Sequence, residues 1–544
     1  MQNLGGSTPR SGDRGPLQSR RSVLLAAGFA GAAAVAGGYE IMRPRPAAAR
    51  TIGQQAPVWL RTRVSGPTPG DWDALRRRLS TDKLLRPGES GYGTAKLLYN
   101  PLFNNLEPAG VAYCKKATDV AQCVNFARTF KLPVRARAGG HSYEGWSSVN
   151  NGLVIDVSEI SWFNNGSGNS VSCGSGIDLI NFYNGLAGHG KAVPGGSCPT
   201  VGIAGLALGG GIGVLARAYG LTCDAIESLD IVTADGSILS CNGSNAHSDL
   251  YWASQGGGGG SFGVVTAFTF RTHNLTRLVT FFLSWPWSAA RRVVSGWQSW
   301  IPHQPDGLWS NLILSAPAGS GGPSIGVGGT FLGSTTACHQ HLEQLFHLVG
   351  SAGVGVPVQR TYLGAMLHEA GCTSVHGCTS PRVPFYAKSD FFSRSLSSAG
   401  IDVLIRNIEA LRGVRGAPGG AGSIAFDALG GAVNRVHPQA TAFVHRDALW
   451  DAQFYTQWNY PGTAAGRRNQ FNWMTEFWQQ LRPHANGQAY QNYVDSALTD
   501  WEQAYYGVNY PRLQQIKAKY DKNQLFTFPQ AIRPAAATGC DLDC

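Results

Sequence analysis

The sequence predicts an α+β protein with two domains, and three observations support this fold class. The chain has 544 residues, which is long for one ordinary domain and ample for two cores. Residues 90–275 alternate helical and strand patterns between glycine-rich turns. Residues 276–488 lack such glycine motifs and alternate Trp-, Phe- and Leu-rich segments with helical patterns, which favours an antiparallel sheet with helices covering one face.

The elements expected in the first domain follow from hydrophobic periodicity. In residues 119–130, Val120, Cys123, Val124 and Ala127 fall on one face of a helix. Asp235-Gly236 is a strong signal for the turn of a β-hairpin. The other expected elements are a strand that begins at Leu132, a buried strand over 153–157, a helix over 177–186, and hairpin strands over 225–233 and 237–240.

The second domain and the C-terminal segment show fewer clear patterns. Residues 339–349 have helical spacing. Residues 511–520 predict a last helix, and Leu525-Phe526-Thr527-Phe528 predicts a terminal strand. We expect the segment that follows residue 488 to pack back on the first domain, so that the second domain is an insertion.

The first 49 residues are typical of a targeting signal. Ser19-Arg20-Arg21-Ser22-Val23-Leu24-Leu25 precedes a mildly apolar stretch to Gly38 and a small-residue cleavage site at Ala47-Ala48-Ala49. This pattern resembles a twin-arginine export signal, which implies the twin-arginine machinery as a partner and a secreted bacterial protein. The apolar stretch is short and rich in Ala and Gly, so a stable membrane anchor is the weaker interpretation.

The charge of the chain does not indicate nucleic-acid binding. The formal net charge is +11, and the first fifty residues contribute +5 of it through seven arginines against two acidic residues. The remaining +6 is spread over a large body without a dense Lys/Arg run. Such a distribution is typical of a solvated surface, so we expect no nucleic-acid partner.

Cysteine usage agrees with export. The eleven cysteines would leave one thiol unpaired in an oxidising compartment. If Cys198 is the unpaired one, ten remain, which is enough for five disulfides. Cys372 with Cys378 and Cys540 with Cys544 are plausible local pairs. The spacing does not match a zinc finger, and we expect no metal site.

The first chemically informative motif is a strand that runs into a glycine turn, Val134-Arg135-Ala136-Arg137-Ala138-Gly139-Gly140-His141-Ser142-Tyr143. The two glycines allow the backbone to approach a ligand closely, and successive N–H groups in such a turn form a concave anion site. A diphosphate would fit there. Taken alone, however, the motif is more often a turn with a buried histidine.

The second motif is the glycine-rich run 194–221, which contains Cys198-Pro199-Thr200-Val201-Gly202. Each glycine costs a helix about 1 kcal/mol, and interleaved apolar residues argue against a linker, so the run indicates backbone lying against a large planar group. Gly211-Ile212-Gly213-Val214-Leu215-Ala216 also matches a dinucleotide-binding pattern. Gly220 would end the following helix too early for a normal crossover unit, which disfavours an NAD site.

Together with later motifs, these segments resemble the berberine-bridge-enzyme-like flavoproteins of the vanillyl-alcohol-oxidase superfamily. The later motifs are Asp249-Leu250-Tyr251-Trp252 with the glycines of 256–260 and Ser261-Phe262-Gly263-Val264-Val265, and the segments 490–495 and 505–521. The resemblance implies a split FAD-binding domain of the PCMH type over 90–275, an inserted substrate-binding domain over 276–488, and a C-terminal segment over 489–532 that returns to the FAD-binding domain.

The resemblance also implies which residues hold FAD. His141 matches the histidine that bonds the flavin 8α-methyl group, and Cys198 matches the cysteine that bonds flavin C6. Val201 stands where the family's oxygen-gating residue lies, and a small aliphatic side chain there favours dioxygen as the electron acceptor. The other residues expected at the FAD are Arg137, Ala138, Gly139, Gly140, Ser142, Ser147, Thr200, Gly202, Gly205, Val265, Tyr490 and Asn492.

Catalysis requires a group that takes a proton from the substrate hydroxyl while hydride moves to flavin N5. Tyr493 matches the family tyrosine cast as this base; the alternative is a tyrosine packed in the core. A free tyrosine titrates near pH 10, about three units above neutrality. Tyr493 would therefore need a neighbouring cation or hydrogen-bond donor to act as a base near neutral pH.

The sequence therefore predicts a secreted, covalently flavinylated FAD oxidase that oxidises the hydroxyl of an alcohol, carbohydrate or secondary metabolite and releases hydrogen peroxide. One alternative is a flavin-dependent dehydrogenase or tailoring enzyme that reacts poorly with dioxygen. The alternative from another class is a flavin-bearing binding protein without turnover. Choice of the small-molecule substrate is expected to reside in the middle segment, where no site residue is assigned.

Overall fold

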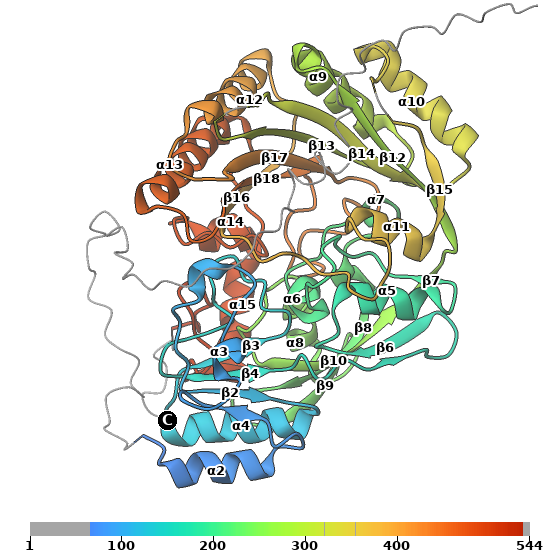
Figure 1. Ribbon diagram of the computed structural model, residues 1–544. Helices are drawn as coiled ribbons and strands as arrows, with labels where there is room; N and C mark the ends of the chain where they lie inside the picture. The colour runs from blue at the N-terminus through green and yellow to red at the C-terminus, as the bar shows by residue number, and fades with distance from the viewer. Residues whose placement is uncertain (1–65, 320, 354, 537–544) are drawn as a thin grey trace, which may run out of the picture.

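The computed structural model describes residues 66–319, 321–353 and 355–536. The predicted export signal over 1–49 and the predicted pair Cys540 and Cys544 lie outside these residues. Figure 1 shows a lower part built on two small sheets and an upper part built on one large sheet. Helices and sheets are segregated in this way in α+β proteins, so the predicted fold class is confirmed.

The lower part begins with a four-stranded sheet that α2 (Pro69–Arg78) and α4 (Ala117–Phe130) cover on one face (Figure 1). In spatial order its strands are β1 (Leu84–Leu85), β2 (Gly110–Tyr113), β4 (Leu153–Asp156) and β3 (Val134–Arg137). The last three are parallel, and β1 is antiparallel to β2. The helix predicted over 119–130 and both predicted strands are therefore confirmed.

A five-stranded antiparallel sheet completes the lower part. In spatial order its strands are β5 (Phe163–Asn164), β6 (Ser170–Gly174), β10 (Val264–Arg271), β8 (Ile226–Val232) and β9 (Ile238–Asn242). The predicted hairpin is confirmed, since β8 pairs with β9 and Gly236 has φ 87° in the turn. The helix expected over 177–186 is α5 (Leu179–Ala187).

Between these sheets the glycine-rich run forms only short elements. They are α6 (Ile203–Leu208) and α7 (Ala216–Tyr219). A further short helix, α8 (Ser248–Ala253), follows β9. Because α7 is one turn long, the crossover helix that an NAD site would require is not present at residues 216–219. A strand, β7 (Lys191–Ala192), pairs with β11 (His273–Asn274) at the edge of this part.

The upper part is a seven-stranded antiparallel sheet. In spatial order its strands are β15 (Val358–Thr361), β12 (Arg277–Trp285), β14 (Ser324–Phe331), β13 (Leu308–Pro317), β17 (Ala421–Ala428), β18 (Trp450–Gln457) and β16 (Phe385–Phe392). Four helices cover its outer face: α9 (Ala290–Trp300), α10 (Thr335–Val349), α12 (Ser398–Ala410) and α13 (Ala464–Leu481) (Figure 1).

Side chains on these strands alternate between two environments, as the pleat requires. On β18, Trp450, Ala452 and Phe454 belong to the core beneath the four helices. Asp451 and the alternate residues after it therefore point to the opposite face, which we call the inner face. Figure 1 shows that the inner face is turned toward the lower part of the molecule.

The C-terminal segment packs on the lower part. It forms α14 (Trp501–Tyr506) and α15 (Tyr510–Asp521), and α15 packs against α8. The terminal strand predicted over 525–528 is wrong. The N–H groups of Leu525 and Phe526 donate to the Asp521 carboxylate, and the Phe526 carbonyl accepts from Lys517 Nζ, so side chains satisfy the backbone groups that a strand would pair.

Within the described residues, one disulfide is formed, between Cys372 and Cys378. The other seven cysteines described form no disulfide. The five disulfides predicted from ten cysteines are therefore not formed within the described residues. Cys114 and Cys123 have their sulfurs 3.9 Å apart, while cysteines such as Cys173 and Cys338 are buried on separate elements. Position in the fold, which the count of cysteines does not reveal, decides which thiols can meet.

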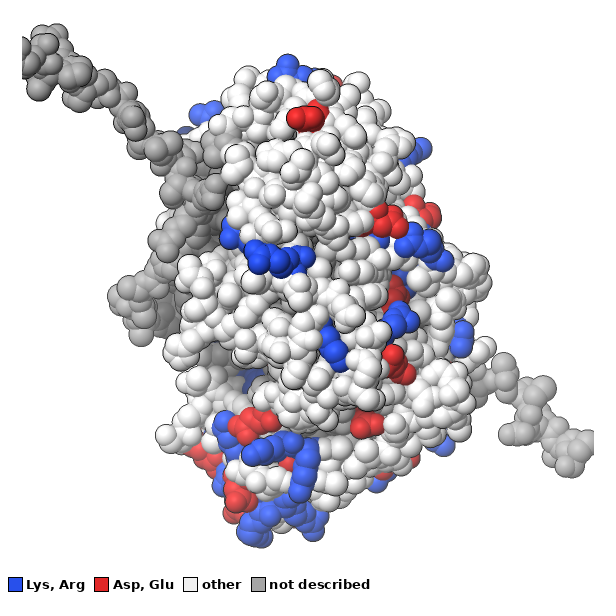
Figure 2. All heavy atoms as spheres, turned by 90° about the vertical axis from the view of Figure 1, so that its right-hand side faces the viewer, with Lys and Arg blue, Asp and Glu red and all other residues white. Residues whose placement is uncertain are grey.

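The surface carries charges of both signs. On the face drawn in Figure 2, basic and acidic side chains lie interspersed and large areas carry neither. In the part of the chain that the structure describes, no helix combines the length and the apolar character needed to cross a bilayer.

Candidate functional site

Two glycine turns of the lower part lie against each other. A Cβ atom on Gly139 would stand 2.5 Å from the backbone nitrogen of Gly202, and one on Gly202 would stand 2.6 Å from that of Gly139. No larger residue fits at either position without moving the backbone. The close approach brings His141 to Thr200, with 2.9 Å between Nε2 and Oγ1.

The turn after β3 presents a run of free donors. Within the described residues, the backbone N–H groups of 139–144 donate no hydrogen bond, and Gly140 has φ 69°. A run of N–H groups without partners at a glycine turn fits an anion such as a diphosphate. Arg137 lies behind the turn in a buried ion pair with Asp156, and its Nη1 has no partner.

His141 and Cys198 share one neighbour, Tyr99. The Tyr99 ring stacks on the imidazole at 4.0 Å between centroids, and the charge of Cys198 helps to raise the pKa of the Tyr99 hydroxyl. Burial lowers the pKa of His141 to about 4, so its imidazole is neutral and nucleophilic at ordinary pH. Burial, with a contribution from Asp427, raises the pKa of the Cys198 thiol.

The C-terminal segment meets the glycine-rich run through two predicted residues. The hydroxyl of Tyr490 accepts hydrogen bonds from the N–H of Gly211 at 2.8 Å and from the Asn492 amide at 2.9 Å. The Asn492 amide also donates to the carbonyl of Leu206 at 3.0 Å. Residues almost three hundred positions apart are therefore fixed side by side.

Tyr493 lies beside the residue that follows the histidine turn. Its ring stacks on that of Tyr143 with 5.2 Å between centroids and 7° between planes. Gln453 on β18 donates to the Tyr143 hydroxyl at 2.5 Å. Burial raises the pKa of Tyr493 well above its ordinary value, and the neighbouring Tyr143, Asp451 and Asp427 raise it further. The described structure does not supply the cation that a tyrosinate would need.

Two carboxyl groups face each other on the inner face. Asp427 on β17 pairs in register with Asp451 on β18, so their Cβ atoms are about 5 Å apart. Asp451 is 1% exposed, and neither carboxyl oxygen has a hydrogen-bond partner. Burial raises the pKa of both carboxyls, and the charge of Asp427 raises that of Asp451 further.

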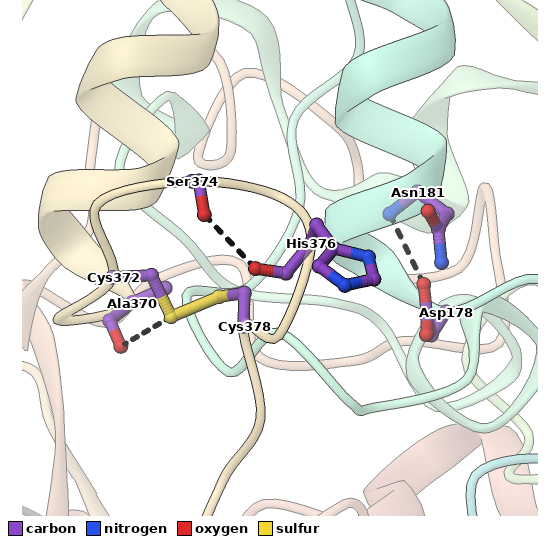
Figure 3. Close-up of a disulfide and its surroundings, with 7 residues drawn as sticks. All are labelled: Asp178, Asn181, Ala370, Cys372, Ser374, His376 and Cys378. Atoms are coloured by element: carbon purple, nitrogen blue, oxygen red, sulfur yellow. Dashed lines mark hydrogen bonds between the residues drawn. A yellow bond between two sulfur atoms is a disulfide. The ribbon is translucent and has the colours of Figure 1, made fainter.

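A third carboxyl comes from α11 (Tyr362–Glu369). Burial, with a contribution from Asp427, raises the pKa of Glu369 to about 7, against a smaller opposing effect of Arg360. The disulfide closes the loop that follows this helix, beside the start of α5, as Figure 3 shows. Cys372, Cys378 and Ala370 pack with Ile180 of α5, so the loop fixes the end of α11 that carries Glu369.

These groups border a recess between the inner face and the lower part. Tyr143, Tyr455, Tyr493, Glu369 and Asp427 are partly exposed, yet burial is the largest cause of the raised pKa of each. A side chain that is surrounded by protein and still accessible to water lies in a concave part of the surface, so these residues line a concave site. Cys198 belongs to the same recess, because it is exposed and its pKa is also raised by burial and by Asp427.

The structure thus brings together most of the predicted site residues. The turn 137–142, the segment 198–202 and the residues 490–493 converge, and Gly205 of α6 borders open space. Val265 instead lies buried at the start of β10 opposite Ile231. The described residues include no group of three His, Cys, Asp or Glu side chains that could hold a metal ion.

Sequence reasoning missed the residues of the inner face and Tyr99. Residues 423–428 and 450–455 do alternate polar and apolar side chains, which is a signal for strands with one polar face. The sequence does not reveal that this polar face is turned inward, nor the register that sets Asp427 opposite Asp451.

Comparisons with known proteins agree with this geometry. A family model described as "FAD binding domain" matches residues 108–242, and one described as "Berberine and berberine like" matches residues 489–533. An uncharacterized FAD-linked oxidoreductase of Bacillus subtilis, YgaK, is 32% identical over 84% of this chain and 97% of its own. The chitooligosaccharide oxidase of Gibberella zeae is 28% identical over 82% of this chain and 90% of its own. The solved structure of Physcomitrella patens BBE-like 1 has a TM-score of 0.76 at 30% identity and covers 84% of this chain and 98% of its own.

Proposed function

Because the chain belongs to the berberine-bridge-enzyme-like family of FAD-linked oxidoreductases, we propose that it is an exported oxidase with a covalently held flavin. Its substrate is an alcohol, a carbohydrate or a hydroxylated secondary metabolite, and its electron acceptor is dioxygen. The chitooligosaccharide oxidase among its relatives supports a carbohydrate or similar polyol as the first class to test.

The fit of the residues to FAD supports this proposal. The free N–H groups of 139–144 suit the diphosphate. A neutral imidazole at His141 and a thiol at Cys198 suit two bonds to the flavin ring, and Tyr99 lies near both. Thr200 contacts the His141 ring, and Tyr490 and Asn492 hold the surrounding backbone in place. When bound, FAD accepts a hydride and, in an oxidase, passes the electrons to dioxygen to give hydrogen peroxide.

The protein then has to manage one proton. Oxidation of an alcohol to a carbonyl removes a hydride from carbon and a proton from oxygen. In the proposal Tyr493 takes that proton, with its ring fixed against Tyr143. Since the pKa of Tyr493 is raised, the phenol must release its own proton as it accepts one. The nearby Asp427 and Asp451 are the groups available to receive it.

The observation that carries the proposal is the convergence of three distant segments. Residues 137–143, 198–202 and 490–493 meet at one recess with a neutral histidine, a solvent-reachable thiol and a tyrosine. Val201 is partly exposed beside Cys198 and matches the oxygen-gating position of the family. Its small aliphatic side chain supports dioxygen as the electron acceptor.

The oxidase proposal is tested by two readings on the purified yellow protein. Anaerobic mixing with a panel of chitooligosaccharides, simple alcohols and aromatic alcohols should bleach the flavin with at least one of them. Admitting air should restore the colour with stoichiometric hydrogen peroxide. Bleaching with slow recovery in air would replace the oxidase with a dehydrogenase, and absence of bleaching by every compound would contradict the enzyme proposal.

Export is proposed on separate grounds. The Arg20-Arg21 motif supports the twin-arginine route, and the disulfide between Cys372 and Cys378 suits an oxidising compartment. Replacing both arginines with lysine should keep the protein inside the cell with its precursor mass. Unchanged release into the medium would contradict this part of the proposal.

A further inference from the structure

We propose that Arg217 is a positioning residue that sets the distance between Cys198 and Asp427 across the recess. This inference rests on the proposed function, because it takes Cys198 as an attachment point of the flavin. It gives Arg217 a task in the flavin site, although the side chain is only 3% exposed.

The Arg217 guanidinium joins the lower part of the molecule to three segments of the upper part. Its Nε donates to the carbonyl of Leu308 at 2.8 Å, its Nη1 to that of Leu429 at 2.6 Å, and its Nη2 to that of Gln304 at 2.8 Å. Leu308 begins β13, Leu429 follows β17, and Gln304 lies in the turn after α9. Hydrogen bonds from a charged donor are roughly twice as strong as neutral ones, so this fork can fix one part on the other.

On the lower side, Arg217 is coupled to the segment that carries Cys198. Gly213 precedes Arg217 by four residues and packs directly on Gly195, because a Cβ atom on Gly213 would stand 1.8 Å from the Gly195 carbonyl oxygen. No side chain fits between the two segments. A shift of residues 213–217 would therefore displace the glycines that precede Cys198.

On the upper side, Arg217 holds the strand ends that carry the carboxyl pair. Leu429 stands two residues after Asp427, and its N–H donates to the carbonyl of Leu449, just before β18, at 2.8 Å. The backbone carbonyl of Arg217 also accepts from the N–H of Ala432 at 2.7 Å. Side chain and backbone of one residue thus bind the turn that follows Asp427.

The two sides come close together at Cys198. Asp427 contributes to the raised pKa of the Cys198 thiol, so the carboxyl group and the sulfur lie near each other across the recess. A negative charge beside a flavin opposes its reduction, because the ring gains electrons. The position of Asp427 should therefore affect the reduction potential of a flavin held at Cys198.

The three carbonyls explain why this residue is an arginine. A guanidinium is a rigid planar fork with five N–H donors, whereas lysine carries its donors on a single nitrogen. One nitrogen cannot reach three carbonyls on three separate segments. Arg217→Lys therefore keeps the positive charge and removes the fork.

A double-mutant cycle on the holoprotein tests the role of Arg217. The reduction potential of the flavin is measured by equilibration with a redox dye, which needs no substrate, in the unaltered protein, Arg217→Lys, Asp427→Asn and the double variant. Asp427→Asn should raise the potential, because it removes negative charge. Arg217→Lys should raise it as well, and the double variant should match Asp427→Asn alone, since Arg217 acts through the position of that carboxyl group.

Two further variants complete the experiment. Thr330→Val removes a second contact between the two parts, the hydrogen bond from the Thr330 hydroxyl to the Val214 carbonyl at 2.7 Å. It should shift the potential in the same direction by a smaller amount, and it tests the inference even if Arg217→Lys does not fold. Arg292→Lys is the matched control, because Arg292 also donates to a backbone carbonyl, that of Val349 at 2.8 Å, but lies on the outer helix α9. It should leave the potential unchanged.

Additive shifts in the double variant would overturn the inference, because Arg217 would then act independently of Asp427. An unchanged potential in Arg217→Lys and Thr330→Val, or in Asp427→Asn, would overturn it as well. Failure of the proposed attachment is detected separately, by the mass of the same holoprotein after denaturation. FAD without a bond to Cys198, together with matching shifts in Asp427→Asn and the double variant, would contradict the attachment and support the role of Arg217.

Discussion

Asp427 and Asp451 occupy directly opposed positions on β17 and β18, and Asp427 also affects the pKa of Cys198, Glu369 and Tyr493. One carboxyl of the inner face is thus close to a proposed flavin attachment point and to the proposed base. The upper sheet therefore contributes charge to a site whose glycine turns come from the lower part, and four of the five following predictions probe this shared site or its supports.

Replacing Tyr493 with phenylalanine should lower the rate of flavin reduction by about 10² to 10⁴, the usual contribution of a positioned proton acceptor. The ring stays, so contact with Tyr143 and the flavin content should not change. Stopped-flow absorbance under nitrogen measures the rate. Tyr143→Phe, which keeps the stack but removes the acceptor of the Gln453 hydrogen bond, is the matched control and should have a smaller effect.

Replacing Val201 with leucine should slow the reaction of the reduced flavin with dioxygen about tenfold, equivalent to about 1.4 kcal/mol in the barrier, because the larger side chain narrows the proposed path of oxygen. The rate of flavin reduction should stay as it was. Double-mixing stopped-flow separates the two steps. An equal slowing of both steps would indicate a general disturbance of the site and contradict the assigned role.

Removing the disulfide by Cys372→Ser with Cys378→Ser should lower the free energy of unfolding by about 2 kcal/mol, the loop entropy expected for a closure of this length. Urea titration measures the change. Because the loop fixes the end of α11, KM should rise more than kcat falls. A stability unaffected by the double substitution would show that the loop does not constrain this region.

Stability should fall between pH 6.5 and 4 partly because of His445. This side chain is fully buried and stacks on Phe391. Its Nδ1 lies 2.8 Å from the amide oxygen of Gln488, and its Nε2 lies 3.3 Å from that of Gln491. Burial lowers its pKa to about 4, so the unfolded chain binds the proton first as pH falls. The stabilisation present above pH 6.5 is then lost, by up to about 3 kcal/mol.

The His445→Gln variant separates this effect from the titration of acidic residues. Its free energy of unfolding should decline less steeply over the same interval, as measured by urea titrations at half-unit steps of pH. Parallel curves for the two proteins would mean that His445 does not titrate as described.

Much of the fold follows from local sequence patterns. The helix over 119–130 and the β8–β9 hairpin follow from periodicity and from one turn signal. The strand expected over 525–528 does not form, because Asp521 and Lys517 bind its backbone groups. Hydrophobic alternation cannot reveal such a competition between side chains and a neighbouring strand. The domain limits at 275 and 488 stay predictions.

The sequence likewise predicts some residues of the candidate site and not others. His141, Cys198 and Tyr493 stand in contiguous motifs and could be selected from the sequence, although their roles remain proposals. Asp427, Asp451 and Glu369 come from separate elements of the middle segment. Strand register and the packing of α11 against α5 bring them to one place. A short sequence motif predicts neither of these features.

Intact-protein mass spectrometry after denaturation tests the central claim most directly. The mature chain should carry the added mass of one FAD, His141→Ala and Cys198→Ala should each keep it through the remaining bond, and the double variant should lose it. A wild-type chain with the mass of the apoprotein would contradict the account, and the roles proposed for His141 and Cys198 would be withdrawn.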